Sequence, residues 1–202
     1  MDVSVDCDKV FIPWKGDFVR VLHTMEDAAG PGWEIIMTKW AALSWTVKAV
    51  KDHEEALKKE LPVWFLHSAG DFEEYLDVSK ERRIAADLGI KTIYELSDSG
   101  VFAGLWDMAE FSGCGLKVKL SDIPILQETV EISDILDENP YQLPSKGSVL
   151  LAVKDAAPIL EELQSQGVEA SLIGRFTDSH DRLIIGREGV RYLEPSTREN
   201  FT

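Results

Sequence analysis

The chain has few of the residues from which disulfide frameworks, zinc sites and membrane anchors are built. Its 202 residues include two cysteines, Cys7 and Cys114, and four histidines without a His-x-x-x-His spacing, so we expect neither a disulfide framework nor a metal site. No apolar run approaches the roughly 20 residues of a membrane-spanning helix. The start, Met1-Asp2-Val3-Ser4, also lacks the features of a signal peptide. We therefore expect a cytoplasmic protein.

Positive charge is scarce as well. The chain has 21 Lys and Arg against 36 Asp and Glu, which gives a formal net charge of -15. Such a surface repels nucleic acid phosphates and anionic lipids, so we expect neither nucleic acid nor membrane as a partner. With 45% hydrophobic and 28% charged residues, the composition is that of an ordinary globular domain.

Hydrophobic periodicity predicts strands that alternate with helices along most of the chain. We expect strands at 3–12, 33–38, 90–95, 147–153 and 170–176, a closing hairpin of 182–186 with 190–193, and helices at 16–29, 41–61, 65–76, 80–88, 101–111, 124–136 and 155–166. The sequence contains no Pro/Gly/Ser-rich linker and no repeat. The predicted fold is therefore one α+β domain with α/β-type layers, in which helices pack on a mixed β-sheet.

The segment 93–125 is the most informative part of the chain. It contains a strand, a polar turn, an amphipathic helix, a Gly113-Cys114-Gly115 break and a second strand, which is the layout of a βαβ unit. A helix N-terminus at such a turn offers free amides and partial positive charge to a phosphate. The candidate phosphate or ligand residues are Glu95, Ser97, Asp98, Ser99 and Gly100.

A simpler interpretation of the same turn is that Ser97, Asp98 or Ser99 caps the following helix, a role that these residue types favour. Carboxylates elsewhere lie in charged helical faces, and no base neighbours Cys114 in the sequence. We therefore assign no catalytic residue and no metal ligand.

Six short segments, in their order and spacing, carry a resemblance to a known family. They are EIIMTKWA at 34–41, VFAGLWDMAEFSGCGL at 101–116, IPILQETVEI at 123–132, NPYQL at 139–143, GSVLL at 147–151 and IGRFT at 173–177. Together they resemble the C-terminal domain of the aminoimidazole ribonucleotide (AIR) synthetase superfamily. Similar domains occur in formylglycinamide ribonucleotide amidotransferase and in the hydrogenase maturation protein that dehydrates a carbamoyl group.

The resemblance implies an AIR synthetase C-terminal-like domain over 31–202, preceded by an extension at 1–30 made of a strand and a helix. Family members usually carry an N-terminal domain that supplies much of the ATP and metal site and the main dimer contact. About 30 residues precede the match here, too few to form that domain. Relatives also have Asp-x-Thr followed by Gly-Gly at the turn, where this chain has Glu95, Ser97 and Ser99. The longer Glu95, the Ser99 side chain and the charge of Asp98 each weaken anion binding.

Three functions are compatible with these observations. We favour a non-catalytic binding or accessory module that acts by self-association or partner docking and needs no cofactor. An alternative is the C-terminal half of a split ATP-dependent synthetase or dehydratase, which phosphorylates an amide or carbonyl oxygen with ATP and Mg. A third is a stand-alone small-molecule or nucleotide sensor. The expected partner is a second copy or a separately encoded nucleotide-binding protein.

Overall fold

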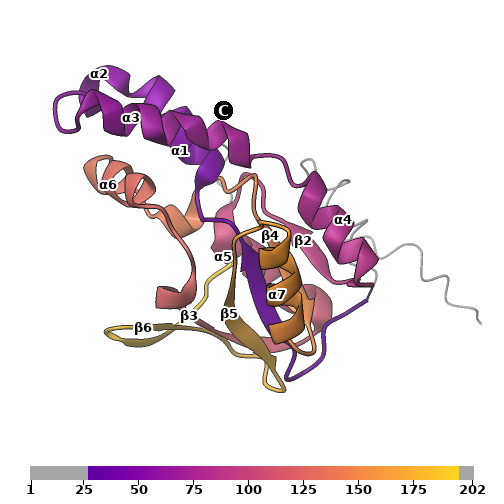
Figure 1. The fold of residues 1–202 in the computed structure, drawn as a ribbon. Helices are drawn as coiled ribbons and strands as arrows, with labels where there is room; N and C mark the ends of the chain where they lie inside the picture. The colour runs from indigo at the N-terminus through magenta and orange to yellow at the C-terminus, as the bar shows by residue number, and fades with distance from the viewer. Residues whose placement is uncertain (1–26, 196–202) are drawn as a thin grey trace, which may run out of the picture.

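The computed structural model describes residues 27–195, and these form one seven-stranded mixed sheet with helices on both faces (Figure 1). The strand order is β2-β4-β1-β5-β3-β6-β7. The strands are β1 (Glu34–Thr38), β2 (Ile93–Glu95), β3 (Gly115–Lys119), β4 (Val149–Val153), β5 (Ala170–Thr177), β6 (Arg182–Gly186) and β7 (Gly189–Tyr192). This confirms the predicted mixed sheet with packed helices. The strand predicted at 3–12, and all but the end of the helix predicted at 16–29, lie outside the described residues, and the division at residue 30 stays a prediction.

Seven α-helices connect the strands within residues 27–195. They are α1 (Leu43–Asp52), α2 (Glu54–Leu57), α3 (Val63–Gly70), α4 (Ser79–Asp87), α5 (Gly100–Ser112), α6 (Gln127–Ile135) and α7 (Ala157–Ser165). Three short 3-10 helices are η3 (Asp71–Tyr75), η4 (Leu120–Asp122) and η5 (Pro140–Gln142). None of the helices in this part of the chain is long and apolar enough to cross a membrane.

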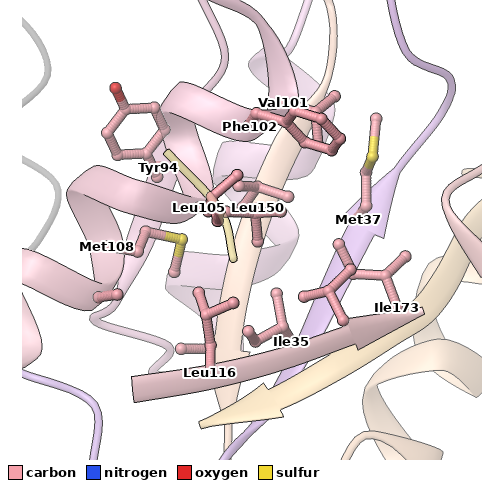
Figure 2. Packing of buried hydrophobic residues seen from close by; sticks show 14 of the residues in the cluster. Ile35, Met37, Tyr94, Val101, Phe102, Leu105, Met108, Leu116, Leu150 and Ile173 are labelled. Carbon is pink, nitrogen blue, oxygen red and sulfur yellow. The ribbon is translucent and has the colours of Figure 1, made fainter. Parts of the chain in front are cut away.

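The two faces of the sheet carry separate cores. Ile35 and Met37 of β1 point to the face covered by α5, where Leu105 and Met108 pack over Leu150 (Figure 2). Ile36, which lies between them, points to the other face. There a second cluster joins β4, β1 and β2 to α4 and α7. Because β4 is covered on both sides, all five of its residues are buried, which confirms the central strand predicted from its continuous apolar run.

The two strands of the βαβ segment are not neighbours in the sheet. β2 and β3 run in the same direction, but β4, β1 and β5 lie between them. Helix α5 therefore crosses one face of the sheet, which explains why eight of its residues are buried. At the crossing, a Cβ on Gly104 would lie 2.5 Å from Leu96 Cδ2, so a larger residue there would have to displace the Leu96 side chain.

Three predicted helices differ from the observed ones. The helix predicted at 65–76 is divided between α3 and the 3-10 helix η3. The helix predicted at 41–61 is interrupted at His53, whose φ of -118° and ψ of 21° leave the helical region before α2 begins. Proline at 124 does not start α6, which begins at Gln127 after an extended Leu126. The Pro124 carbonyl instead accepts a hydrogen bond from the Ala41 amide at 2.9 Å, because the fixed φ of proline suits an extended connection as well as a first helical turn.

Candidate functional site

The candidate turn follows the last residue of β2 and ends at the N-terminus of α5. Glu95, at the end of β2, binds Arg82 of α4 through both carboxylate oxygens, which accept from Nε and Nη2. This hydrogen bonding raises the pKa of the Arg82 guanidinium. Both partners thus satisfy each other, and the Glu95 carboxylate does not point an unpaired oxygen at a ligand.

The three polar residues of the turn have separate environments. The Ser97 carbonyl accepts from the Ser145 amide at 2.9 Å. The Asp98 carboxylate lies 3.0 Å from Lys146 Nζ in an exposed ion pair. Ser99 occupies the N-cap position of α5, but its side chain makes no capping hydrogen bond. The capping interpretation is therefore wrong for Ser99, although the residue stands at the right position.

Gly100 is required by packing inside the protein. Its φ is 76°, and a Cβ there would lie 2.6 Å from the Gln142 carbonyl carbon and 2.8 Å from the Leu143 oxygen. The neighbouring rings of Phe102 and Tyr141 stack with centroids 5.4 Å apart. The glycine that remains from the family pattern thus lets α5 approach the η5 segment, and its presence needs no ligand.

A buried serine that the sequence interpretation missed holds the turn in place. The Ser145 hydroxyl accepts from the Ala42 amide at 2.9 Å and donates to the Leu143 carbonyl at 2.9 Å. With its own amide bound to Ser97, it ties the turn to the start of α1. Pro144 and Gly147 flank it in the sequence and indicate only a turn. No local pattern signals these contacts.

A buried ion pair supports α4, the helix that carries Arg82. Lys39 Nζ lies 2.8 Å from a Glu81 carboxylate oxygen, and it donates to the carbonyls of Tyr75 at 2.8 Å and Asp77 at 2.6 Å. The Glu81 side chain is 1% exposed. This pair joins the end of β1 to the beginning of α4 beside the turn, and sequence analysis did not identify it.

The turn lies in neither of the two best-formed hollows. One, of about 250 Å³, is lined by residues between Ser133 and Asn139. The other, of about 320 Å³, lies between Trp33, Lys91 and Lys154. Residues 27–195 also contain no group of three His, Cys, Asp or Glu side chains that could hold a metal ion. The candidate turn thus lies outside both hollows, Glu95 and Asp98 are each paired with a cation from another part of the chain, and Gly100 is buried.

The fold is a layered α/β domain. Its turn between β2 and α5 is held in place by hydrogen bonds of Ser145. The chain belongs to the family described as AIR synthase related protein, C-terminal domain, which matches residues 30–186. The family resemblance is confirmed.

Two curated relatives share part of this region. A hydrogenase expression/formation protein of Methanocaldococcus jannaschii is 34% identical over 109 residues, which cover 52% of this chain and 32% of the relative. The carbamoyl dehydratase HypE of Rhodobacter capsulatus is 30% identical over 101 residues, covering 48% of this chain and 30% of the relative. Each match thus spans about a third of the relative's length.

Solved structures show the same fold. HypE of E. coli superposes with a TM-score of 0.66 at 19% identity, covering 88% of this chain and 53% of that structure. A HypE structure in complex with ATP and a HypE–HypF complex each give a TM-score of 0.61, at 14% and 19% identity, and the chain covers 52% and 54% of them. The chain therefore spans about half of each HypE structure.

Proposed function

We propose that this chain is a non-catalytic accessory module derived from the AIR synthase C-terminal domain, and that it acts by self-association or docking to a partner. The observation that carries the proposal is the state of the family's phosphate turn. Each of its charged residues is paired with a cation of the same chain, and its glycine is used for internal packing.

The negative charge of the turn supports this proposal more strongly than its ion pairs do. Exposed pairs such as Asp98–Lys146 contribute only about 0–1 kcal/mol, so a ligand could displace them. The carboxylates would then remain beside the phosphate. Asp98 lies two residues before the first residue of α5, and its negative charge opposes anion binding at that helix end. The partial positive charge of one helix end is small against a full negative charge.

The docking part of the proposal is supported by the relatives. HypE forms a complex with HypF, so a protein that shares this fold works in contact with another chain. What the present chain contacts is a proposal, because it spans only about half of that HypE.

Isothermal titration calorimetry with ATP and Mg tests the non-catalytic role. We expect no saturable heat for the natural chain. A matched variant that restores the family pattern, Glu95→Asp with Ser97→Thr and Ser99→Gly, is expected to bind more strongly than the natural chain. Tight, magnesium-dependent binding of ATP by the natural chain would refute the proposal.

The split-enzyme alternative is favoured by one observation, the HypE structure in complex with ATP. In that case ATP and Mg would be held mainly by a separate nucleotide-binding chain, and Glu95, Ser97 and Gly100 would close over the phosphates. ATP turnover in a mixture with that chain, lost with Ser97→Ala and retained with an exposed control such as Ser165→Ala, would establish it. A sensor role would instead give a thermal shift with a small ligand and no turnover.

A further inference from the structure

Half of one sheet face has no helix over it among residues 27–195. On this face α4 and α7 pack against β2, β4 and β1, whereas the β6–β7 hairpin extends away from them (Figure 1). We call the uncovered part the open sheet face. Its residues are Leu172, Arg175, Lys117, Lys119, Leu183, Ile185, Val190 and Tyr192.

Strand register places these side chains on one side of the sheet. Lys117 pairs with Arg175 on β5 and with Leu183 on β6, and Leu183 in turn pairs with Tyr192 on β7. A register shift on β5 leaves Ile173 as the additional residue, so Leu172 and Arg175 both face outward. The second row, two residues along each strand, contains Lys119, Ile185 and Val190.

On the open sheet face, Lys117 and Lys119 of β3 lie between Leu172 on β5 and the apolar residues of β6 and β7. Val190 and Tyr192 are 62% and 68% exposed, and Leu172 and Ile185 are 38% and 36% exposed. Such grouped apolar exposure indicates an interaction surface, whereas scattered single residues do not. Lys119 Nζ lies 3.7 Å from an Asp122 carboxylate oxygen, and Arg175 Nη2 lies 3.9 Å from a Glu34 carboxylate oxygen. These contacts are long and exposed, so they leave much of the positive charge available.

Another surface of the same chain has the opposite charge and its own exposed apolar residues. No Lys or Arg occurs between residues 120 and 145, whereas this stretch contains six Asp and Glu. Within it, α6 packs Thr129 and Ile132 inward against α1 and α3. Its outer side exposes Val130 and Ile135, 42% and 37% exposed, beside Asp134.

We propose that the open sheet face binds the α6 segment, residues 127–138 comprising α6 and the turn after it, of a second copy of this chain. Asp134 would face Lys117 and Lys119, while Val130 and Ile135, which lie on either side of it around the helix, would contact Leu172 and Ile185 on the strands that flank β3. The docked helix would complete the layer that α4 and α7 begin on the same side of the sheet. If two copies exchange this contact reciprocally, the assembly closes as a two-fold dimer; otherwise it grows into larger oligomers. The inference rests on the self-association part of the proposed function.

Charge-swap variants of the full chain test this contact by sedimentation velocity. One variant carries Lys117→Glu with Lys119→Glu, and the other carries Asp134→Lys with Glu138→Lys. We expect each alone to associate at least about 10-fold more weakly, because like charges then oppose each other across the contact. An equimolar mixture is expected to regain the association, since each altered surface meets its complement in the other variant.

Matched controls change the same charge elsewhere on exposed helical positions. They are Lys48→Glu with Lys80→Glu, and Asp87→Lys with Glu161→Lys. These are expected to associate like the natural chain, and circular dichroism melting verifies that every variant is folded.

The possible failures have different meanings. A natural chain that stays monomeric at about 100 µM, where a micromolar dimer is nearly complete, overturns both this contact and self-association as the function. If the charge-swap variants associate as strongly as the natural chain, or if their mixture does not regain association, only the proposed contact is overturned.

Discussion

Gly100 lies so close to Leu143 that a Cβ on the glycine would be 2.8 Å from the leucine carbonyl oxygen. In the family pattern, glycine at this turn indicates close approach to a phosphate. In this structure the close approach is to the protein's own backbone. The same residue type therefore fits two explanations, and the contact decides which one it needs here.

The Gly100 contact predicts a large loss of stability in Gly100→Ala. The new Cβ would meet backbone atoms that cannot rotate away, and the φ of 76° is also unfavourable for alanine. We expect a loss of about 2–4 kcal/mol in the free energy of unfolding, measured in urea. Gly89→Ala is the matched control, because Gly89 has a φ of 67° and nothing within 4 Å. An equal loss in both variants would show that backbone strain alone is responsible.

The buried Lys39–Glu81 pair predicts that Glu81→Gln is strongly destabilising. Removing the charge leaves the Lys39 ammonium, 11% exposed, without its counter-ion, and breaking such a pair costs about 3–5 kcal/mol. Glu73→Gln in the exposed Lys51–Glu73 pair, 3.4 Å apart, is the control, and we expect less than about 0.5 kcal/mol there. Chemical denaturation of both variants measures the difference. An unchanged free energy of unfolding in Glu81→Gln would indicate that the desolvation cost of the two charges offsets their attraction.

Ser145→Ala tests the brace between the turn and α1. The substitution leaves the Ala42 amide without the hydroxyl that binds it, and a buried unsatisfied donor costs about 1–3 kcal/mol. Hydrogen exchange should also become faster at the Ala42 amide. Ser165→Ala on exposed α7 is the control and should change neither measurement. Unchanged exchange at Ala42 would exclude the bracing role of the hydroxyl.

Tyr141 predicts a loss of stability at high pH. Burial raises the pKa of its hydroxyl above the ordinary value of 10.0. A raised native pKa means that the stabilisation is complete below the unfolded pKa near 10 and is lost as the pH rises through the native value. Urea unfolding between pH 8 and pH 11 measures this. Tyr141→Phe, compared with Tyr192→Phe at an exposed position, should reduce the alkaline loss; identical slopes in all three proteins would contradict the prediction.

The sequence predicted those elements whose buried residues follow the regular spacing of a strand or a helix. The run at 149–153 was identified as a central strand because burial on both faces makes every residue apolar. Helix α5 was predicted within one or two residues, since its apolar side chains follow helical spacing. Prediction failed at His53 and Pro124. There the chain leaves or delays a helix because of contacts made elsewhere, which periodicity does not record.

The ligand-binding role of the candidate turn stays a prediction, and the sequence did not indicate the partners of its residues. Sequence analysis located Glu95, Asp98 and Gly100 at the turn and noted that they depart from the family pattern. It could not predict that Arg82, Lys146 and Leu143 would meet them, because these partners come from other elements that only the sheet order brings to the same edge.

The sequence by itself determined the family, the layered fold and the departures of the turn from the family pattern, because these depend on residue types at fixed local spacing. Only the tertiary structure decided which partners Glu95, Asp98 and Gly100 meet and which part of the sheet has no helix over it among residues 27–195. Both depend on contacts between segments far apart in the chain, such as Gly100 against Leu143 and Lys117 beside Leu183, whose energies no local pattern encodes.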